Sequence, residues 1–314
     1  MNRARGASDR SRSNAPRRRA PTPWLLLGPA LLLVVGLRVV PMLLDVAASV
    51  TDLNLARPYD PVTFVGLDNY GTLLQTSDFQ DAVITTAVIS LPALALEMVI
   101  GLALALWLTR SFRGRGTARS VMLLPYLLTP VVIGNFFRMF YSAEFGQLNY
   151  YLQAIHVVSG NVAWLTDLST VRPAIIVMEV WHTTPFVTLL CLAGLLSLPR
   201  EPIEAATVDG ASPWQSFRHV ILPMLAPVLV ATFALRAMDI LQLFDEVYVM
   251  TGGGPGHLSE VFNLYLYKRG FRTFQMGFTS AAAIVLVIAV GILGLVAVLA
   301  QRRQARRATE ATDA

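Results

Sequence analysis

The sequence predicts an all-α, polytopic membrane protein with six transmembrane helices. Of its 314 residues, 54% are hydrophobic and only 14% are charged, so the chain is more apolar than an ordinary globular domain. About twenty consecutive apolar residues are needed to cross the hydrocarbon core of a bilayer. Six windows reach that length, and they cover residues 24–44, 83–108, 120–141, 173–197, 222–244 and 277–300.

The direction of these helices follows from the charges between them. Residues 1–22, 109–119 and 302–314 are rich in arginine, as cytoplasmic segments of membrane proteins are. The connection of residues 45–82 instead holds six aspartates and a single arginine, Arg57. We therefore expect this acidic connection outside the cell, with both termini and the connection between the fourth and fifth windows in the cytoplasm.

The two ends of the chain lack the pattern of a membrane span. Residues 1–22 contain Arg, Ser, Pro and Ala without apolar periodicity, which predicts a disordered basic cytoplasmic tail, and residues 302–314 predict a cytoplasmic C-terminal tail. The net charge of +5 comes mostly from these tails, so we expect arginine contacts with the lipid bilayer and no nucleic acid. The first window also has features of a signal peptide, with small residues at 47–49, but its apolar run is too long for one. We expect it to remain as the first span.

Motifs for catalysis, nucleotides or metals are missing from the sequence. The single cysteine, Cys191, lies in the fourth window, and no Cys or His cluster has the spacing of metal ligands. The glycine-rich segment 251–256 lacks the Gly-Lys-Ser/Thr ending of a phosphate-binding loop and is expected to be a turn. We therefore expect no enzymatic activity, no metal and no cofactor bound by this chain.

A polar segment between the fourth and fifth windows reads EAATVDGASPWQSFRHVILP from Glu204 onward. Pro199 and Pro202 end the preceding helix, because proline has no N–H to donate and disfavours a helical residue before it. A new helix near Pro202 places Glu204 in its first turn, and Asp209-Gly210 ends it as a turn. Such a helix lies across the membrane surface. It is either an ordinary amphipathic connection or a helix that docks in a groove of another protein.

The same segment resembles the EAA loop of ABC importer permeases. In that family, Glu-Ala-Ala is followed after three residues by Gly and after nine more by Ile-x-Leu-Pro; here Val220 replaces the Ile. Residues 64–70, 179–186 and 243–253 are similar to segments of carbohydrate-uptake permeases of the maltose, trehalose and glycerol-phosphate type. The likeness covers about 60–300, with the EAA loop its most diagnostic part.

The resemblance implies residues 23–301 as an ABC importer transmembrane domain with a coupling loop at 199–223. It implies a permease in the plasma or inner membrane that forms, with a second permease, the pathway for a sugar, a di- or oligosaccharide. An external solute-binding protein would deliver the sugar, and a separate cytoplasmic ATPase dimer would bind ATP and Mg and hydrolyse the ATP. The positions it assigns to ATPase coupling are Glu204, Ala205, Ala206, Asp209, Gly210 and Pro223.

Polar side chains inside the windows mark a candidate solute path, because each costs about 2.5 to 3.5 kcal/mol to insert. A sugar needs hydrogen-bonding groups and an aromatic face, and both lie near the outer ends of the windows. Glu97 lies deeper and is expected to form a hydrogen bond between helices. The expected pathway residues are Asn135, Arg138, Glu179, Trp181, His182, Thr183, Phe186, Arg236, Asp239 and Gln242.

Alternatives remain open for this set. Arg236 and Asp239 are spaced i, i+3 and could form a purely structural pair, and the aromatic residues could belong to an interfacial belt. Three arginines, Arg38, Arg138 and Arg236, lie at one expected depth and would suit a phosphate, so a permease for a polyol or glycerol phosphate stays an alternative. A secondary sugar transporter is a weaker one, because inverted repeats and a central ion site are missing from the sequence.

Overall fold

The computed structural model describes residues 23–312, and the predicted N-terminal tail lies outside them. Five helices are long and apolar enough to cross a membrane, and a sixth span results if one sharply bent pair is counted as one. The first is continuous through α1 (Pro23–Val34), η1 (Val35–Val39) and α2 (Val40–Ser49). The others are α4 (Ser77–Thr109), α8 (Val171–Ser197), α14 (Met276–Thr312) and the continuous stretch of α10 (Pro213–Ser216), η2 (Phe217–Ile221) and α11 (Leu222–Ile240).

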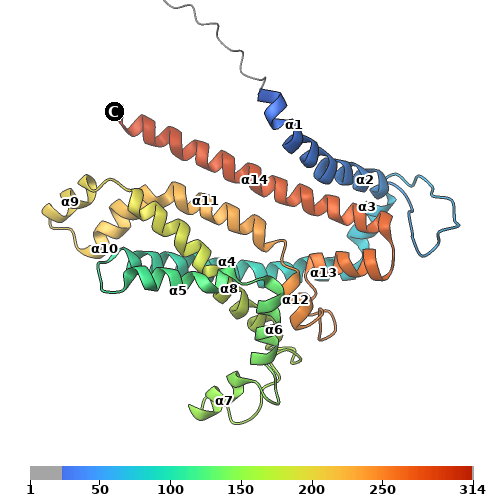
Figure 1. Cartoon of the computed structure of the whole chain (residues 1–314), viewed down its shortest axis with the longest axis horizontal. Coiled ribbons are helices and arrows are strands. Elements are labelled where there is room, and N and C mark those ends of the chain that lie inside the picture. Colours follow the sequence, from blue (N-terminus) through green and yellow to red (C-terminus); the bar gives the residue numbers. More distant parts are fainter. Residues whose placement is uncertain (1–22, 313–314) are drawn as a thin grey trace, which may run out of the picture.

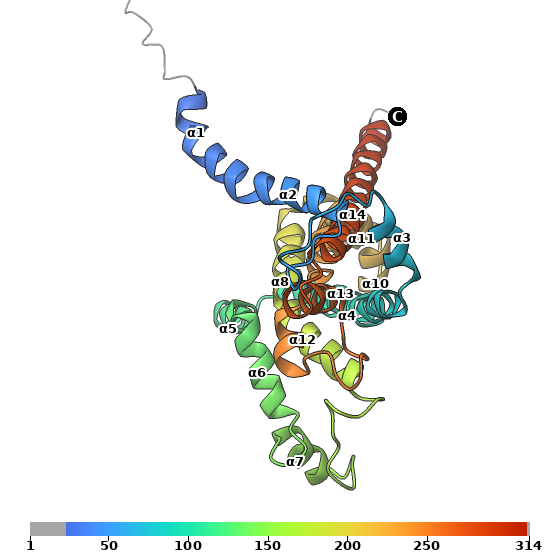
Figure 2. The same ribbon diagram turned by 90° about the vertical axis from the view of Figure 1, so that its right-hand side faces the viewer.

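The long helices α4, α8, α11 and α14 lie along the long axis of the molecule and form a bundle (Figure 1). The first helix leans away from this bundle, and only α2 packs against α14 (Figure 2). The share of its apolar window that is buried is 0%. Among the described residues, α4 and α8 form the most extensive helix pair, and they carry the polar groups described below.

The window at 120–141 was predicted as one continuous span, but in the structure its helix is broken. Its residues form α5 (Arg115–Leu127) and α6 (Pro130–Phe140), which meet at an angle of 92°. Leu128 and Thr129 have extended backbone between them, because Pro130 disfavours a helical residue before it and supplies no N–H. In consequence α6 leaves the bundle nearly at right angles and leads to α7 (Gln147–Ala154), as Figure 1 shows.

Two other predicted ends differ from the structure. The fifth span was expected over 222–244, but its helix starts at Pro213 and ends at Ile240, before the short helix α12 (Asp245–Met250). The last helix runs on to Thr312, because the tail sequence QRRQARRATEAT contains mostly good helix formers. The fifth helix therefore begins before its apolar window, and the last helix continues beyond its window.

Short helices and turns close the end of the bundle opposite α9. They are α3 (Asp68–Gln75), α13 (Phe262–Tyr267) and η3 (Lys268–Arg272). In the acidic connection, Asp52 accepts hydrogen bonds from the Thr63 backbone N at 2.6 Å and from its hydroxyl at 2.7 Å, which holds the pKa of Asp52 below its usual value. These bonds join the two ends of the loop between Asp52 and Thr63.

A buried apolar cluster joins the bent pair to the bundle. Ile89 from α4, Ile133 from α6, Met178 from α8 and Val247 from α12 belong to it, and all four are fully buried. Because α6 and α12 pack together on this cluster, the chain on either side of the bend stays attached to α8. This places α12 beside the polar residues of α8.

The segment predicted to form a surface helix does so. Its helix is α9 (Glu201–Val208), with Glu201 and Glu204 in its first turn, and Gly210 follows with φ +80°, a left-handed conformation that favours glycine. Ser212 then caps α10 in a capping box with Gln215. In Figure 1, α9 and α10 lie at the same end of the molecule as the end of α14.

The close contact of α4 with α8 depends on Gly101. A Cβ at this position would lie 2.7 Å from Val187 Cγ1 and 3.2 Å from the Thr188 backbone N, whereas Gly291 on α14 has no atom within 4 Å of its Cβ position. We expect Gly101→Ala to lower the free energy of unfolding by about 1–3 kcal/mol through overpacking. The control Gly291→Ala should raise it by up to about 1 kcal/mol. Denaturant titration of the detergent-solubilised chain measures both, and equal shifts would contradict this packing.

Candidate functional site

Arg236 on α11 is the centre of a buried polar network. Its Nε donates to Glu97 Oε2 at 2.6 Å, and its Nη1 donates to Asp239 Oδ2 at 2.6 Å. Its Nη2 contacts Glu179 Oε1 and donates to Glu97 Oε1 and Thr183 Oγ1, each at 3.2 Å. One guanidinium thus ties α4, α8 and α11 together. The predictions that Glu97 forms a bond between helices and that Arg236 pairs with Asp239 are confirmed.

The three carboxylates of this network differ in exposure. Arg236 is 1% exposed and Glu97 is fully buried, whereas the side chain of Asp239 is 67% exposed. A buried charge that loses its partner is strongly destabilising, while an exposed ion pair contributes little. Glu97 and Glu179 therefore hold Arg236 in place, and Asp239 is accessible to a solute.

A cavity of about 350 Å³ opens beside this network. The structure brings six of the ten predicted pathway residues to its wall: Glu179, His182, Thr183, Arg236, Asp239 and Gln242. Tyr126 and the acidic pair Asp245 and Glu246 also line it and were not predicted from the sequence. The acidic pair lies directly after the fifth window, within the segment 243–253 that resembles carbohydrate-uptake permeases. That position was the one feature of the sequence that could have indicated it.

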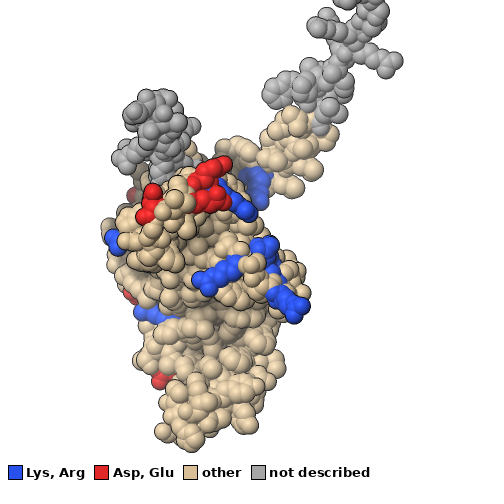
Figure 3. All heavy atoms as spheres, turned by 90° about the vertical axis from the view of Figure 1, so that its left-hand side faces the viewer, with Lys and Arg blue, Asp and Glu red and all other residues tan. Residues whose placement is uncertain are grey.

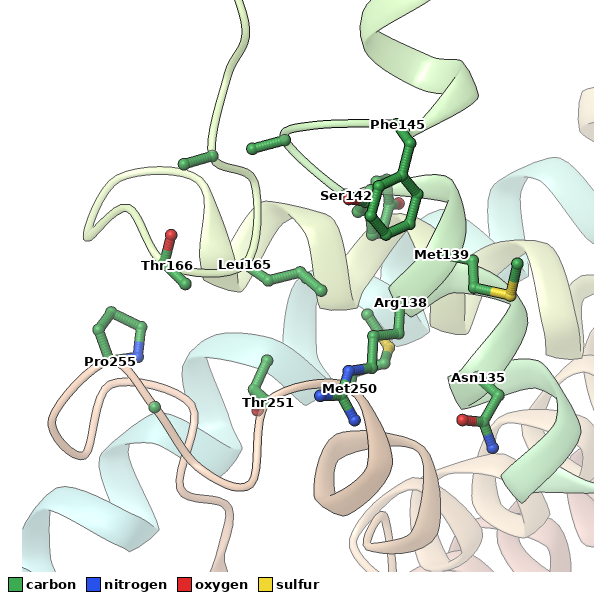
Figure 4. Close-up of a pocket in the computed structure, with 14 residues that line it drawn as sticks. Asn135, Arg138, Met139, Ser142, Phe145, Leu165, Thr166, Met250, Thr251 and Pro255 are labelled. Atoms are coloured by element: carbon green, nitrogen blue, oxygen red, sulfur yellow. The ribbon is translucent and has the colours of Figure 1, made fainter.

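Asn135 and Arg138 line a different pocket, of about 610 Å³, so the structure does not bring them together with the other six residues. They lie on α6, and the bend before this helix carries them away from the network. Figure 4 shows Arg138 directed toward Met250 and Thr251 at the end of α12. Its Nη1 donates to the Val249 carbonyl O at 3.4 Å.

The two aromatic candidates line neither of these pockets. Phe186 is stacked on Tyr126 with 5.0 Å between ring centroids, so it supports an aromatic face of the 350 Å³ cavity from behind. Trp181 packs against Phe137 at 5.4 Å and is 42% exposed on the other side of α8. The aromatic side chains that line the 350 Å³ cavity are instead Tyr126 and Phe244.

The sequence of the chain matches a known protein family. Residues 97–310 match the model of the family described as binding-protein-dependent transport system inner membrane component. The chain belongs to this family. It is a permease component of an ABC importer and a multi-pass inner-membrane protein, as the resemblance of its EAA loop predicted.

Two relatives cover most of this permease. It is 36% identical over 227 residues to the trehalose/maltose transport system permease protein MalF of Thermococcus litoralis, with 72% of this chain and 76% of the relative covered. It is 34% identical over 269 residues to the trehalose transport system permease protein SugA of Mycobacterium tuberculosis, with 86% and 85% covered.

A solved structure shares the fold of the permease. It is the crystal structure of a bacterial alginate ABC transporter in complex with an alginate pentasaccharide-bound periplasmic protein. One of its chains matches with a TM-score of 0.77 at 24% identity, covering 89% of this chain and 93% of that one. This likeness confirms the predicted all-α membrane fold.

The predicted coupling residues of the permease gather on an exposed surface. Glu204, Ala205, Asp209 and Gly210 are exposed, and Ala206 is half-buried. No atom of the described chain lies within 4 Å of a Cβ built on Gly210, so within the chain this glycine is required by its backbone conformation alone. Val208, at the end of α9, is 87% exposed.

Pro223 is also exposed, at the start of α11 directly after the π-helical turn η2, so it lies apart from the surface of α9. Figure 3 views the molecule from the end that carries α9, where groups of both charges lie on the surface. The exposed charged residues of the connection after α4 and of the segment from Arg200 through η2 are Arg110, Arg113, Arg200, Glu201, Glu204, Asp209 and Arg218. A helix with these neighbours lies outside the hydrocarbon core.

Glu97 and Asp239 both bond to Arg236 but differ in burial, so neutralising each of them should have a different effect on stability. Glu97→Gln removes a fully buried partner and should lower the free energy of unfolding by about 3 kcal/mol. Asp239→Asn removes an exposed partner while Glu97 and Glu179 remain, so the loss should stay below about 1 kcal/mol. Unfolding of the two purified variants in detergent measures the difference. A larger loss for Asp239→Asn would show that the buried contacts do not hold Arg236.

Proposed function

We propose that this permease is one of two membrane subunits of a sugar importer. A second, non-identical permease completes the pathway, and an external solute-binding protein delivers a di- or oligosaccharide. A cytoplasmic ATPase dimer binds ATP and Mg and hydrolyses the ATP. The names of the relatives as trehalose and trehalose/maltose permeases support the sugar assignment.

The exposed helix α9 supports the coupling role. Glu204 and Ala205 of its EAA segment are exposed, and its apolar Val208 is 87% exposed at a charged end of the molecule. A short helix of this kind fits a groove on a soluble partner. Closure of the ATPases would then move α9, and with it α11 through the continuous helix from Pro213, as a rigid lever. This role places both termini and the loop 199–223 in the cytoplasm.

The single observation that carries the solute path is the 350 Å³ cavity at the Arg236 network. Asp239 and Gln242 are exposed there beside Tyr126, so hydrogen-bonding groups and an aromatic face meet at one place. Hydroxyl groups of a sugar can donate to the carboxylate and the amide oxygen and accept from the amide N–H.

The charges of this cavity favour an uncharged solute over glycerol phosphate. Arg236 is already bonded to three carboxylates, Arg138 lies in the other pocket, and Arg38 is exposed on the first helix. The three arginines thus do not converge on one phosphate. A polyol remains the second candidate, because it offers the same hydroxyl groups as a sugar.

Coupling can be tested at Gly210 with Gly114 as a matched control. Both have positive φ, at +80° and +85°, and neither has an atom within 4 Å of its Cβ position. A Leu at either site costs the same order of backbone strain, roughly 1–2 kcal/mol. We expect Gly210→Leu to reduce sugar-stimulated ATP hydrolysis at least tenfold in proteoliposomes containing the binding protein, and Gly114→Leu to leave most of it. Equal activity of the two variants would refute the coupling role of α9.

The solute path can be tested with Gln242 and Asn135, which line different pockets. Losing a hydrogen bond to a neutral hydroxyl costs roughly 0.5–1.5 kcal/mol, so Gln242→Ala should raise the sugar concentration for half-maximal uptake about three- to tenfold. Asn135→Ala should leave it unchanged. Radiolabelled sugar uptake measures both, and the opposite pattern would place the path in the 610 Å³ pocket that Asn135 lines.

A further inference from the structure

Three side chains of the cavity wall lie close together although two helices supply them. Glu179 and His182 are spaced i, i+3 on α8 and share one face of that helix. Glu246 comes from the first turn of α12, which the bend at Pro130 and the apolar cluster hold against α8. One ligand atom from each of the three lies within 4.8 Å of the other two. The residues are 3%, 5% and 7% exposed.

Three polar atoms of this group lack hydrogen-bond partners. Glu179 Oε2 and both ring nitrogens of His182 are buried without a hydrogen bond to any described residue. His182 Nδ1 lies 3.5 Å from Glu246 Oε1, which is too long for a good hydrogen bond. Buried polar groups are normally bonded, so these three atoms indicate a missing ligand.

The buried charges point to the sign of that ligand. Glu97, Glu179 and Glu246 are buried carboxylates, and the buried cation among the described residues of this network is Arg236. With all three carboxylates ionised, this set carries two more negative charges than positive ones. Isolated charges are very costly to bury. A divalent cation would balance them.

We propose that Glu179, His182 and Glu246 bind one Zn²⁺ ion in the wall of the cavity. Zinc takes imidazole nitrogen and carboxylate oxygen at about 2.0–2.2 Å, which separates tetrahedral ligands by about 3.4 Å. The separation of 3.5 Å between His182 Nδ1 and Glu246 Oε1 already suits it. Glu179 would use Oε2 for the metal while its Oε1 stays on Arg236, so the guanidinium orients the ligand as an outer partner.

The sequence predicted no metal bound by this chain, because it has no Cys or His cluster with the spacing of metal ligands. Two carboxylates and one histidine from two helices leave no such spacing in the sequence. With three protein ligands, the fourth position of the ion would open to the cavity. The metal would also link α8 to α12, because its proposed ligands come from both helices.

Zinc content of the purified full chain tests the site. After dialysis against buffered zinc, the wild type should retain one Zn²⁺ per chain. His182→Gln and Glu246→Gln should each weaken binding at least tenfold. His257→Gln is the matched control, because His257 also pairs with a glutamate, Glu260, but lies outside the cavity. Absence of zinc from the wild type, or equal retention by His182→Gln and the wild type, would overturn the proposal.

A ligand exchange guards against variants that merely misfold. His182→Cys should bind Co²⁺ with a thiolate-to-cobalt absorption band, which the wild type should lack because its one cysteine, Cys191, is buried elsewhere in α8. A folded His182→Cys chain without this band would contradict the site. Metal binding is measured here without transport, so its failure would leave the proposed uptake role standing.

Discussion

The burial of Arg236 in a membrane-spanning helix constrains the rest of this permease. A guanidinium there needs carboxylates close by, and Glu97 and Glu179 must come from two other helices to supply them. That requirement fixes the rotation of α4, α8 and α11 about their axes. It also explains why a polar cavity exists at this level, because a network of charges cannot be covered by apolar side chains alone.

The helix α8 links packing to function. On one face, fully buried Val187 lies where Gly101 of α4 leaves room for it. One to two turns earlier, the same helix presents Thr183 and Glu179 to Arg236 and His182 to α12. Overpacking at Gly101 would therefore shift the polar residues as well. Helix packing and the geometry of the cavity are not independent in this chain.

Sequence reasoning reached features that depend on local chemistry. The helix α9 followed from two prolines and from Gly210, and the role of Glu97 followed from the cost of a carboxylate in an apolar window. The apolar windows also located the bundle. Each of these depends on residues near one another in the chain.

Features that depend on three-dimensional grouping could not be obtained this way. Equal depth was taken to place Arg138 beside Arg236, but depth says nothing about the direction of α6 after Pro130. Glu246 was missed for the related reason that it lies beyond the window yet folds back onto α8. An apolar count also cannot show a bend inside a window, because the residues on both sides of it are equally hydrophobic.

The break at Leu128 and Thr129 has a consequence for water. The extended backbone of Leu128 and Thr129 interrupts the helical hydrogen bonding between α5 and α6, and lipid cannot supply the missing partners. Non-helical backbone at membrane depth is tolerated only in protein or beside water, and Leu128 and Pro130 line the cavity. The break therefore lies beside a polar cavity from which water can reach its backbone groups. A solute that entered this cavity would exchange places with that water, and its own polar groups would have to replace the hydrogen bonds that the water made.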